Sequence, residues 1–306
     1  MSLRRSVFAL CLAALALPAC GSVDADEPAY EQGDRGATVR NGVVLNGVVL
    51  NGVVLNGVVL NGVVLNGVVL NGSALSGATA DGKKSYFGDG FIGAVFQGLL
   101  AGGGTTPVYI DDARVVGDVW TYTASFLDPA TNARLPLCGV DAAGAPIEAI
   151  GLVGRWDYRE GVPGGGSHVD DPSAFTFACR NAALGKCVDL GYKPWASVNG
   201  TSLKNHHQAC TRMLRADYCG DGRSFTVDGT PINLYDNLGI QKDTLAFPFE
   251  AEWVPSGARF IASGDNQRFR QLGGTPPECY SKKVSSTAGQ LSHFSDGTLL
   301  MNEYQK

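Results

Sequence analysis

Apolar and polar side chains alternate along several segments of the chain, and this alternation predicts β-strands. Residues 115–126 have a period of two, with aromatic residues on one face and threonines and a serine on the other. Such a pattern is typical of an antiparallel strand with one face buried. Residues 245–253 alternate in the same way, with Glu250 and Glu252 on the polar face, and Pro248 restricts this strand to an edge or a bulge. Further strands are expected at 147–153, 174–179, 224–227, 231–235 and 258–262.

Two segments between these strands follow the helical period instead. Apolar residues share one face in residues 181–190 and again in residues 201–218, and these faces include Cys187 and Cys210. Gly191 follows the first segment, at the position where helices commonly end in a left-handed residue. The fold class we predict is therefore α+β: a mainly antiparallel β body with one helical hairpin.

The N-terminus has the composition of a targeting segment. Two arginines precede an apolar run at 7–17, which is too short to cross a bilayer as a helix. The following Leu-Pro-Ala-Cys resembles the lipobox of bacterial lipoproteins, so we expect residues 1–19 to be a signal peptide and Cys20 to carry lipid. The alternative is an ordinary secretory signal that is cleaved nearby. By resemblance to Gram-negative lipoproteins, Ser22 predicts an outer-membrane lipoprotein, and the acidic residues 20–40 predict a linker.

Residues 41–80 repeat with a period of five. Six identical copies of Asn-Gly-Val-Val-Leu fill residues 41–70, and two degenerate copies follow, the first of which is Asn71-Gly-Ser-Ala-Leu. Asn-Gly favours tight turns and Val-Val-Leu favours strands. The period resembles that of pentapeptide-repeat proteins, although Gly stands where that family usually has Leu or Phe. We therefore expect either a short β-solenoid or a flexible, aggregation-prone spacer.

Composition narrows the class of protein further. The 306 residues carry a net charge of −5, and only 17% of them are charged. A basic surface for nucleic acid is thereby excluded, so no nucleic-acid partner is expected. The 41 glycines favour a turn-rich, β-rich chain over a long coiled coil.

Cysteine positions predict that disulfides stabilise the body. Of the eight cysteines, one leaves with the signal peptide and Cys20 carries lipid, so six remain. An even number in an exported chain indicates disulfides. Facing residues of an antiparallel hairpin have nearly constant sums of residue numbers, and this favours a nested set of pairs. The nested set is Cys187–Cys210, Cys179–Cys219 and Cys138–Cys279. The alternative is local closure of near neighbours, Cys179–Cys187 and Cys210–Cys219.

A set of short motifs in the body carries a family resemblance. The central motif is Ala216-Asp217-Tyr218-Cys219, which Gly-Asp-Gly follows. The motifs that flank it are Pro136-Leu-Cys-Gly139, Gly154-Arg-Trp-Asp157, Pro163-Gly-Gly-Gly-Ser-His168, Phe175-Thr-Phe-Ala-Cys179, Gly191-Tyr-Lys-Pro-Trp195 and His207-Gln-Ala-Cys-Thr-Arg-Met213. Together they resemble the ADYC domain of lipoproteins from myxobacteria and their relatives, over residues 104–280 within a globular body at 81–306. The resemblance implies a cell-envelope setting and no catalytic residues, because the family has no established activity.

Histidines supply the remaining candidate chemistry. His206, His207 and Cys210 place one imidazole and one thiol on the same helix face. A metal site takes three or four ligands, and an exported cysteine is usually paired, so we expect no metal and no cofactor. His168 with Asp217 or His207 provides residue types of a catalytic triad, but no nucleophile motif accompanies them.

These observations predict an exported, lipid-anchored protein of the cell envelope that binds or scaffolds. Its expected partners are the membrane, through the lipid, and an envelope protein or a polysaccharide. The alternative is an extracytoplasmic hydrolase with a site near His168, His207 and Asp217. The two interpretations differ in geometry, because an enzyme gathers these side chains in one cleft and a scaffold leaves them dispersed.

Overall fold

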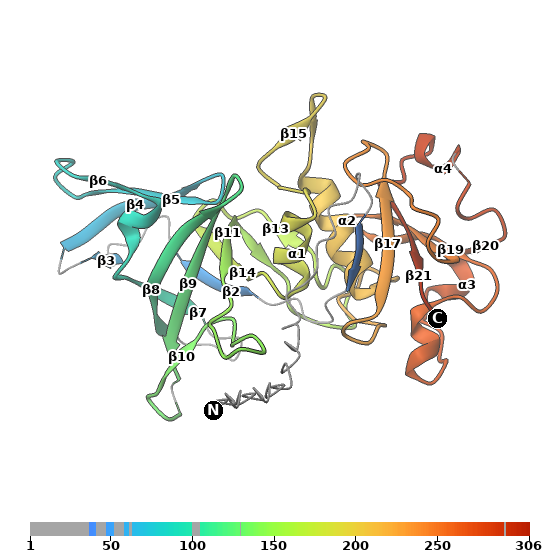
Figure 1. The fold of residues 1–306 in the computed structure, drawn as a ribbon, viewed down its shortest axis with the longest axis horizontal. Coiled ribbons are helices and arrows are strands. Elements are labelled where there is room, and N and C mark those ends of the chain that lie inside the picture. Colours follow the sequence, from blue (N-terminus) through green and yellow to red (C-terminus); the bar gives the residue numbers. More distant parts are fainter. Residues whose placement is uncertain are drawn as a thin grey trace, which may run out of the picture.

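Two β-sheets lie on either side of a pair of helices (Figure 1). This arrangement is that of a computed structural model, which describes residues 37–40, 47–51, 58–60, 63–99, 105–128, 130–290 and 292–306. The predicted signal peptide and Cys20 lie outside the described residues. The α+β class is confirmed, since the sheets are mainly antiparallel and one helical hairpin packs between them.

The larger sheet contains eleven strands, and all of its pairings are antiparallel. Its strands are β2 Gly47–Asn51, β3 Val58–Leu60, β4 Val63–Asn71, β5 Ala74–Thr79, β6 Ser85–Phe87, β7 Ala94–Leu99, β8 Thr105–Val116, β9 Val119–Leu127, β10 Arg134–Pro136, β11 Ala149–Val153 and β14 Ala174–Cys179. They follow the order β10-β9-β11-β14-β2-β7-β3-β4-β5-β6, and β8 pairs with both β7 and β9.

The smaller sheet contains six strands, ordered β1-β17-β21-β18-β19-β20. Its strands are β1 Ala37–Arg40, β17 Pro231–Asp236, β18 Phe249–Val254, β19 Gly257–Ala262, β20 Val284–Ser285 and β21 Leu300–Tyr304. β1 lies beside β17 (Figure 1), so the expectation of a solvated linker is wrong for residues 37–40. Two small ribbons complete the strands: β12 Arg155–Trp156 with β13 His168–Val169, and β15 Ser197–Val198 with β16 Thr201–Ser202.

The predicted helical hairpin is confirmed, and it is shorter than expected at both ends. Its helices are α1 Ala183–Asp189 and α2 Lys204–Arg215. Gly191 ends α1 as predicted, with a φ of 96° and with its N–H bonded to the carbonyl of Val188 (2.9 Å). The short helices are η1 Gly88–Phe91, η2 Arg268–Leu272, α3 Tyr280–Lys283 and α4 Ser292–Ser295. No helix in the described ranges combines the length and the apolar character that crossing a bilayer requires.

The described residues of the repeat are strands of the larger sheet. β2 and β3 come from identical copies, and β2 lies between β14 and β7. A solenoid stacks successive turns in parallel, whereas these strands pair antiparallel with their neighbours. Leu65, Val68 and Leu75 are buried against the aromatic residues of the sheet. Over these residues the repeat is part of the folded body, so the solenoid and the spacer are both wrong there.

The alternation of apolar and polar residues predicted the positions of most strands. It did not predict which side chains of those strands are buried. Strands expected at 147–153, 174–179, 231–235 and 258–262 are present as β11, β14, β17 and β19. The alternating residues 115–126 span the turn between β8 and β9, and Thr121 on the polar face is buried. Glu250 and Glu252 are likewise buried in β18, where Arg268 pairs with Glu250 and where His293 and Thr298 bind the carboxylate of Glu252. The strand predicted at 224–227 is absent.

One of the three predicted disulfides is confirmed and two are wrong. Cys187 bonds to Cys210 across the hairpin, as their shared apolar face predicts. The other bonds are Cys138–Cys179 and Cys219–Cys279, which excludes both the nested set and local closure. The rule that facing residues have a nearly constant sum of residue numbers holds only within the two helices. α1 begins after Cys179 and α2 ends before Cys219, so these two cysteines lie outside the hairpin and beside different sheets.

Candidate functional site

The motif Ala216–Cys219 begins where α2 ends. Ala216 has left-handed dihedral angles, with a φ of 51° and a ψ of 38°. Its N–H donates to the carbonyl of Met213 (3.0 Å), and the N–H of Asp217 donates to the carbonyl of Arg212 (2.9 Å). This pair of bonds is the Schellman motif, which satisfies carbonyls that a helix end leaves without partners. The motif therefore stops α2 and turns the chain.

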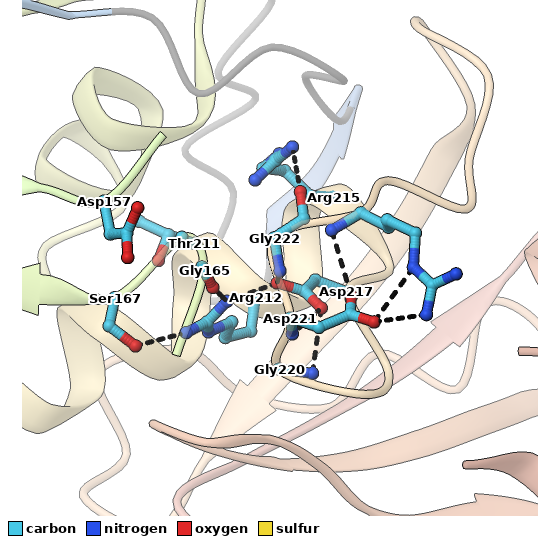
Figure 2. A network of polar contacts seen from close by, with 12 residues as sticks. Asp157, Gly165, Ser167, Thr211, Arg212, Arg215, Asp217, Gly220, Asp221 and Gly222 are labelled. Carbon is cyan, nitrogen blue, oxygen red and sulfur yellow. Dashed lines mark hydrogen bonds and ion pairs between the residues drawn. The ribbon is translucent and has the colours of Figure 1, made fainter. Parts of the chain in front are cut away.

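Asp217 is fully buried and organises the turn that follows α2 (Figure 2). Its carboxylate accepts hydrogen bonds from the backbone N–H groups of Gly220 (2.9 Å), Asp221 (3.1 Å) and Gly222 (3.0 Å). It is also ion-paired with the buried guanidinium of Arg212. A carboxylate offers about four acceptor sites, so these protein donors occupy its capacity. Asp217 thus has a structural role in this fold.

Arg212 extends this network to two other segments of the chain. Its guanidinium donates to the hydroxyl of Ser167 (2.7 Å), to the carbonyl of Gly165 and to the carbonyl of Pro255 (3.2 Å). Ser167 and Gly165 belong to the loop that joins β12 to β13 (Figure 2). A Cβ on Gly165 would lie 2.3 Å from the carbonyl oxygen of Arg159, which explains why glycine stands there. Arg212 therefore connects the loop of the β12–β13 hairpin to α2 through hydrogen bonds.

Tyr218 and Cys219 anchor the turn to the smaller sheet. The buried Tyr218 hydroxyl donates to the carboxylate of Glu250 (2.5 Å) and accepts from the N–H of Arg268 (3.1 Å). Burial, with the negative charge of Glu250 nearby, holds the pKa of Tyr218 well above its ordinary value. Cys219 is bonded to Cys279. All four residues of the motif thus have positions in the core or the backbone framework.

A cavity of about 160 Å³ lies close to this framework, since its lining residue Gln208 donates to the carbonyl of Gly166 in the β12–β13 loop. Trp156 and His168 line it from β12 and β13, and His207 lines it from α2. Trp195, in the loop before β15, forms another wall. Gly72 of the degenerate repeat copy completes the lining, since a Cβ there would lie 3.3 Å from the Trp195 ring. Five separate stretches of the chain therefore build the cavity.

The two cavity histidines flank Trp156 and are held by backbone carbonyls. The ring centroids of Trp156 and His168 are 4.6 Å apart, and those of Trp156 and His207 are 5.9 Å apart. Nε2 of His168 lies 2.9 Å from the carbonyl oxygen of Val153, and Nε2 of His207 lies 3.0 Å from that of Leu184. A carbonyl only accepts, so each ring places a proton on Nε2.

Burial makes both rings poor bases. It is the main cause that lowers the pKa of His168, and it lowers the pKa of His207 to about 4. The backbone carbonyl of Leu184 opposes this shift at His207, but burial dominates. His207 is therefore neutral near pH 7, with Nδ1 unprotonated.

Polar side chains form one side of the cavity. Gln208 accepts from the N–H of His168 (3.0 Å) and donates to the carbonyl of Gly166 (3.0 Å), which fixes the hairpin against α2. Lys204 and Asp170 form an ion pair at the opening, where 79% of the Asp170 side chain is exposed. Because the two charges neutralise each other, this side of the cavity combines donors and acceptors without a net charge.

The structure brings together two of the three residues predicted for a hydrolase. His168 and His207 line one cavity, whereas Asp217 lies outside it and holds the turn after α2. Cys210 has no free thiolate to offer a metal, because it is bonded to Cys187. Nε2 of His206 is 2.7 Å from the amide oxygen of Asn237, away from these groups. Nowhere in the described ranges do three potential metal ligands converge.

Sequence reasoning did not find the aromatic walls of the cavity. Trp156 and Trp195 stand in motifs that carried the family resemblance, but neither lies in an alternating or helical pattern that indicates a function. Gly72 gave one signal, since it belongs to the first copy that departs from the repeat consensus. Its role is visible only when the repeat is packed on the body.

Comparison with known families supports the motif assignment. The ADYC domain matches residues 88–267, more than half of the chain, and the chain therefore belongs to the ADYC domain family. Pentapeptide repeats, in eight copies, match residues 44–79. Neither a curated protein nor a solved structure matches the chain.

Proposed function

We propose that this ADYC-domain protein is exported, anchored by lipid on Cys20 to the outer membrane of the cell envelope, and binds a ligand in the Trp156–Trp195 cavity. The sequence before Cys20 supports export. Three disulfides in the body support an oxidising compartment, where such bonds persist.

The cavity is the observation that carries the binding role. Ligand sites are concave, largely apolar and fitted with a few converging polar groups. Here two indoles provide apolar walls, and Gln208 and Lys204 provide polar groups on one side. Among the described lining residues there is a single carboxylate, Asp170, and no hydroxyl or thiol. A triad hydrolase needs a nucleophile and a glycosidase usually needs two carboxylates, so the lining favours binding over hydrolysis.

Lipid attachment is tested by growing expressing cells with a clickable fatty acid. We expect the purified parent protein to carry the label and Cys20→Ala to lack it. Cys11→Ala is the matched control, because Cys11 also lies in the leader but precedes the lipobox, and it should retain the label. Equal labelling of Cys20→Ala and the parent would show that the anchor is elsewhere, and an unlabelled parent would remove the lipoprotein assignment.

A further inference from the structure

We propose that the Trp156–Trp195 cavity is the terminal subsite of a glycan-binding surface, which takes the end of a neutral oligosaccharide. This inference rests on the binding role proposed above and assigns a chemical class to the ligand. A sugar ring has faces of C–H bonds and an edge of hydroxyl groups. It therefore needs an apolar platform together with donors and acceptors around it.

Trp195 supplies the platform. It lies beside Pro194 and against Gly72 and is 36% exposed, so part of its large ring is accessible to a ligand. Val153 on the same cavity is 49% exposed. The apolar surface thus continues from the cavity to its opening, where one face of a sugar ring can pack.

Trp156 supplies a donor that the protein itself does not use. The residue is only 4% exposed, and its indole N–H has no hydrogen-bond partner in the described part of the chain. A buried donor without an acceptor costs about 1–3 kcal/mol, so such groups are nearly always paired. Because the indole nitrogen is itself buried, a hydroxyl oxygen of a ligand in the cavity accepts from it only after a small movement of the cavity wall.

The charges around the cavity favour a neutral polyhydroxyl ligand over an anion. Lys204 is the one ammonium group in the described lining, and Asp170 already neutralises it. Both histidines donate to backbone carbonyls and have lowered pKa values, so they add no cationic charge near pH 7. A phosphate group would meet no unpaired cation here, whereas hydroxyl groups can both donate and accept.

The size of the cavity indicates the end of a chain. Its volume of about 160 Å³ is well below the roughly 300–1,000 Å³ of pockets that enclose a drug-sized ligand. One ring can therefore be enclosed, and the rest of a longer ligand must lie outside.

A second aromatic pair adjoins the degenerate repeat copy, and we assign to it the continuation of the chain. A Cβ on Gly72 would lie 3.3 Å from the Trp195 ring, and the hydroxyl of the next residue, Ser73, accepts a hydrogen bond from the backbone N–H of Trp120 (2.7 Å). The Trp120 ring is half-buried and packs edge to face with Phe87, with centroids 5.8 Å apart. Phe87 is 49% exposed. The degenerate repeat copy thus links the cavity to a second exposed aromatic surface.

The experiment is calorimetric titration of the full mature protein in detergent with three oligosaccharide series, each from monomer to hexamer. The series are β-1,4-linked glucose, β-1,4-linked N-acetylglucosamine and α-1,4-linked glucose. We expect at least one series to bind with a Kd near or below about 1 mM, and more tightly as the chain lengthens. Trp195→Ala should weaken binding at least about tenfold, and Trp195→Phe should recover part of it.

Two further variants separate the parts of the surface. Trp156→Phe keeps a ring but removes the N–H, and a lost hydrogen bond predicts about two- to tenfold weaker binding of every length. Phe87→Ala should weaken the hexamer and leave the monomer unchanged. Leu272→Ala, which also removes an exposed apolar side chain, is the control and should bind like the parent.

Three results would overturn the glycan assignment. They are no binding of any series, unchanged binding by Trp195→Ala, or binding of phosphate, decanoate or an apolar peptide in place of the sugars. Near-ultraviolet circular dichroism of each variant checks that it is folded. The lipid-label experiment is independent, so failure to bind sugars leaves the anchoring result intact, and an unlabelled parent leaves the sugar titration valid.

Discussion

The two halves of the body are held together by different chemistry. The repeat-side core, on the larger sheet, packs Leu65 and Leu75 against phenylalanines and a tyrosine, and its fully buried polar residues, such as Thr176, are uncharged. The helix-side core, between the helices and the smaller sheet, surrounds Trp253 and also contains the buried ion pair of Glu250 and Arg268. Apolar packing accepts many residues of suitable size, whereas each buried charge requires a partner at a fixed place.

This difference explains which copies of the repeat can have identical sequences and which copy must differ. Strands from identical copies pair through backbone groups, which are the same in every copy. The degenerate copy adds a contact that depends on its own side chain, since the hydroxyl of Ser73 accepts from the backbone N–H of Trp120. Valine in place of Ser73 would have no oxygen for this bond.

The largest effect is expected from breaking the charged framework of the helix side. Asp217→Ala leaves the buried guanidinium of Arg212 and three backbone N–H groups without their acceptor. Loss of one partner of a buried pair costs about 3–5 kcal/mol, and we expect the free energy of unfolding to fall by that amount. Urea unfolding with the disulfides intact measures it.

Asp170→Ala is the matched control, because that carboxylate is also ion-paired but is 79% exposed. Surface pairs contribute about 0–1 kcal/mol, so this variant should be nearly as stable as the parent. Equal losses in the two variants would contradict a special role for the buried network.

The repeat side is tested by Leu75→Ala, which removes a fully buried side chain. A core leucine-to-alanine change costs about 2–5 kcal/mol, and we expect a loss near the middle of that range in urea unfolding. Val69→Ala in the preceding copy removes a side chain that is 41% exposed and should change stability by less than about 0.5 kcal/mol. If the repeat were only a spacer, both variants would unfold like the parent.

Secondary structure could be predicted from the sequence where it depends on the pattern within a single segment. The apolar faces of the two helical segments, with Gly191 after the first, predicted the hairpin and its Cys187–Cys210 bond. The same reasoning failed for Cys179 and Cys219, because their partners are set by how the chain leaves the hairpin. Cys179 ends a strand of the larger sheet before the hairpin begins, and the turn that Asp217 holds after α2 brings Cys219 to Cys279.

The candidate site was predictable only in part, for a related reason. His168 and His207 were identified by residue type, and both line the cavity. Glu250 was assigned to solvent because a period of two cannot reveal that Arg268, 18 residues later, returns to pair with it. Trp156 in β12 and Trp195 in the loop before β15 come together only through tertiary packing, so no spacing in the chain indicates their shared cavity.

A smaller effect is expected at His207, which lies where α2 meets the cavity. Its pKa in the folded protein is lowered to about 4, below the ordinary 6.5. Between these values the unfolded chain binds a proton that the folded chain does not, so the stability from neutral His207 is present above pH 6.5 and is lost as the pH falls toward 4.

His207→Gln keeps a donor for the carbonyl of Leu184 but does not titrate. We expect the fall in unfolding free energy from pH 7 to pH 4 to be smaller in the variant by on the order of 2–3 kcal/mol. Carboxylates titrate in both proteins and cancel in this difference. Parallel stability curves across this range would contradict the assignment of a buried neutral ring.

The smallest effect is expected where two helix ends can be compared directly. α1 ends on Gly191 and α2 ends on Ala216, and both residues have positive φ. Ala216→Gly relieves a left-handed conformation that costs an L-residue about 1–2 kcal/mol. It also removes a buried methyl group worth about 0.8 kcal/mol and adds chain entropy worth about 0.5–1 kcal/mol. These terms oppose one another, so the unfolding free energy should change by less than about 1 kcal/mol.

Gly191→Ala introduces the same strain and places a Cβ 2.8 Å from Ile240, so its unfolding free energy should fall clearly more in the same urea titration. Equal losses at the two sites would show that the conformation of the helix end, rather than its packing, sets the cost.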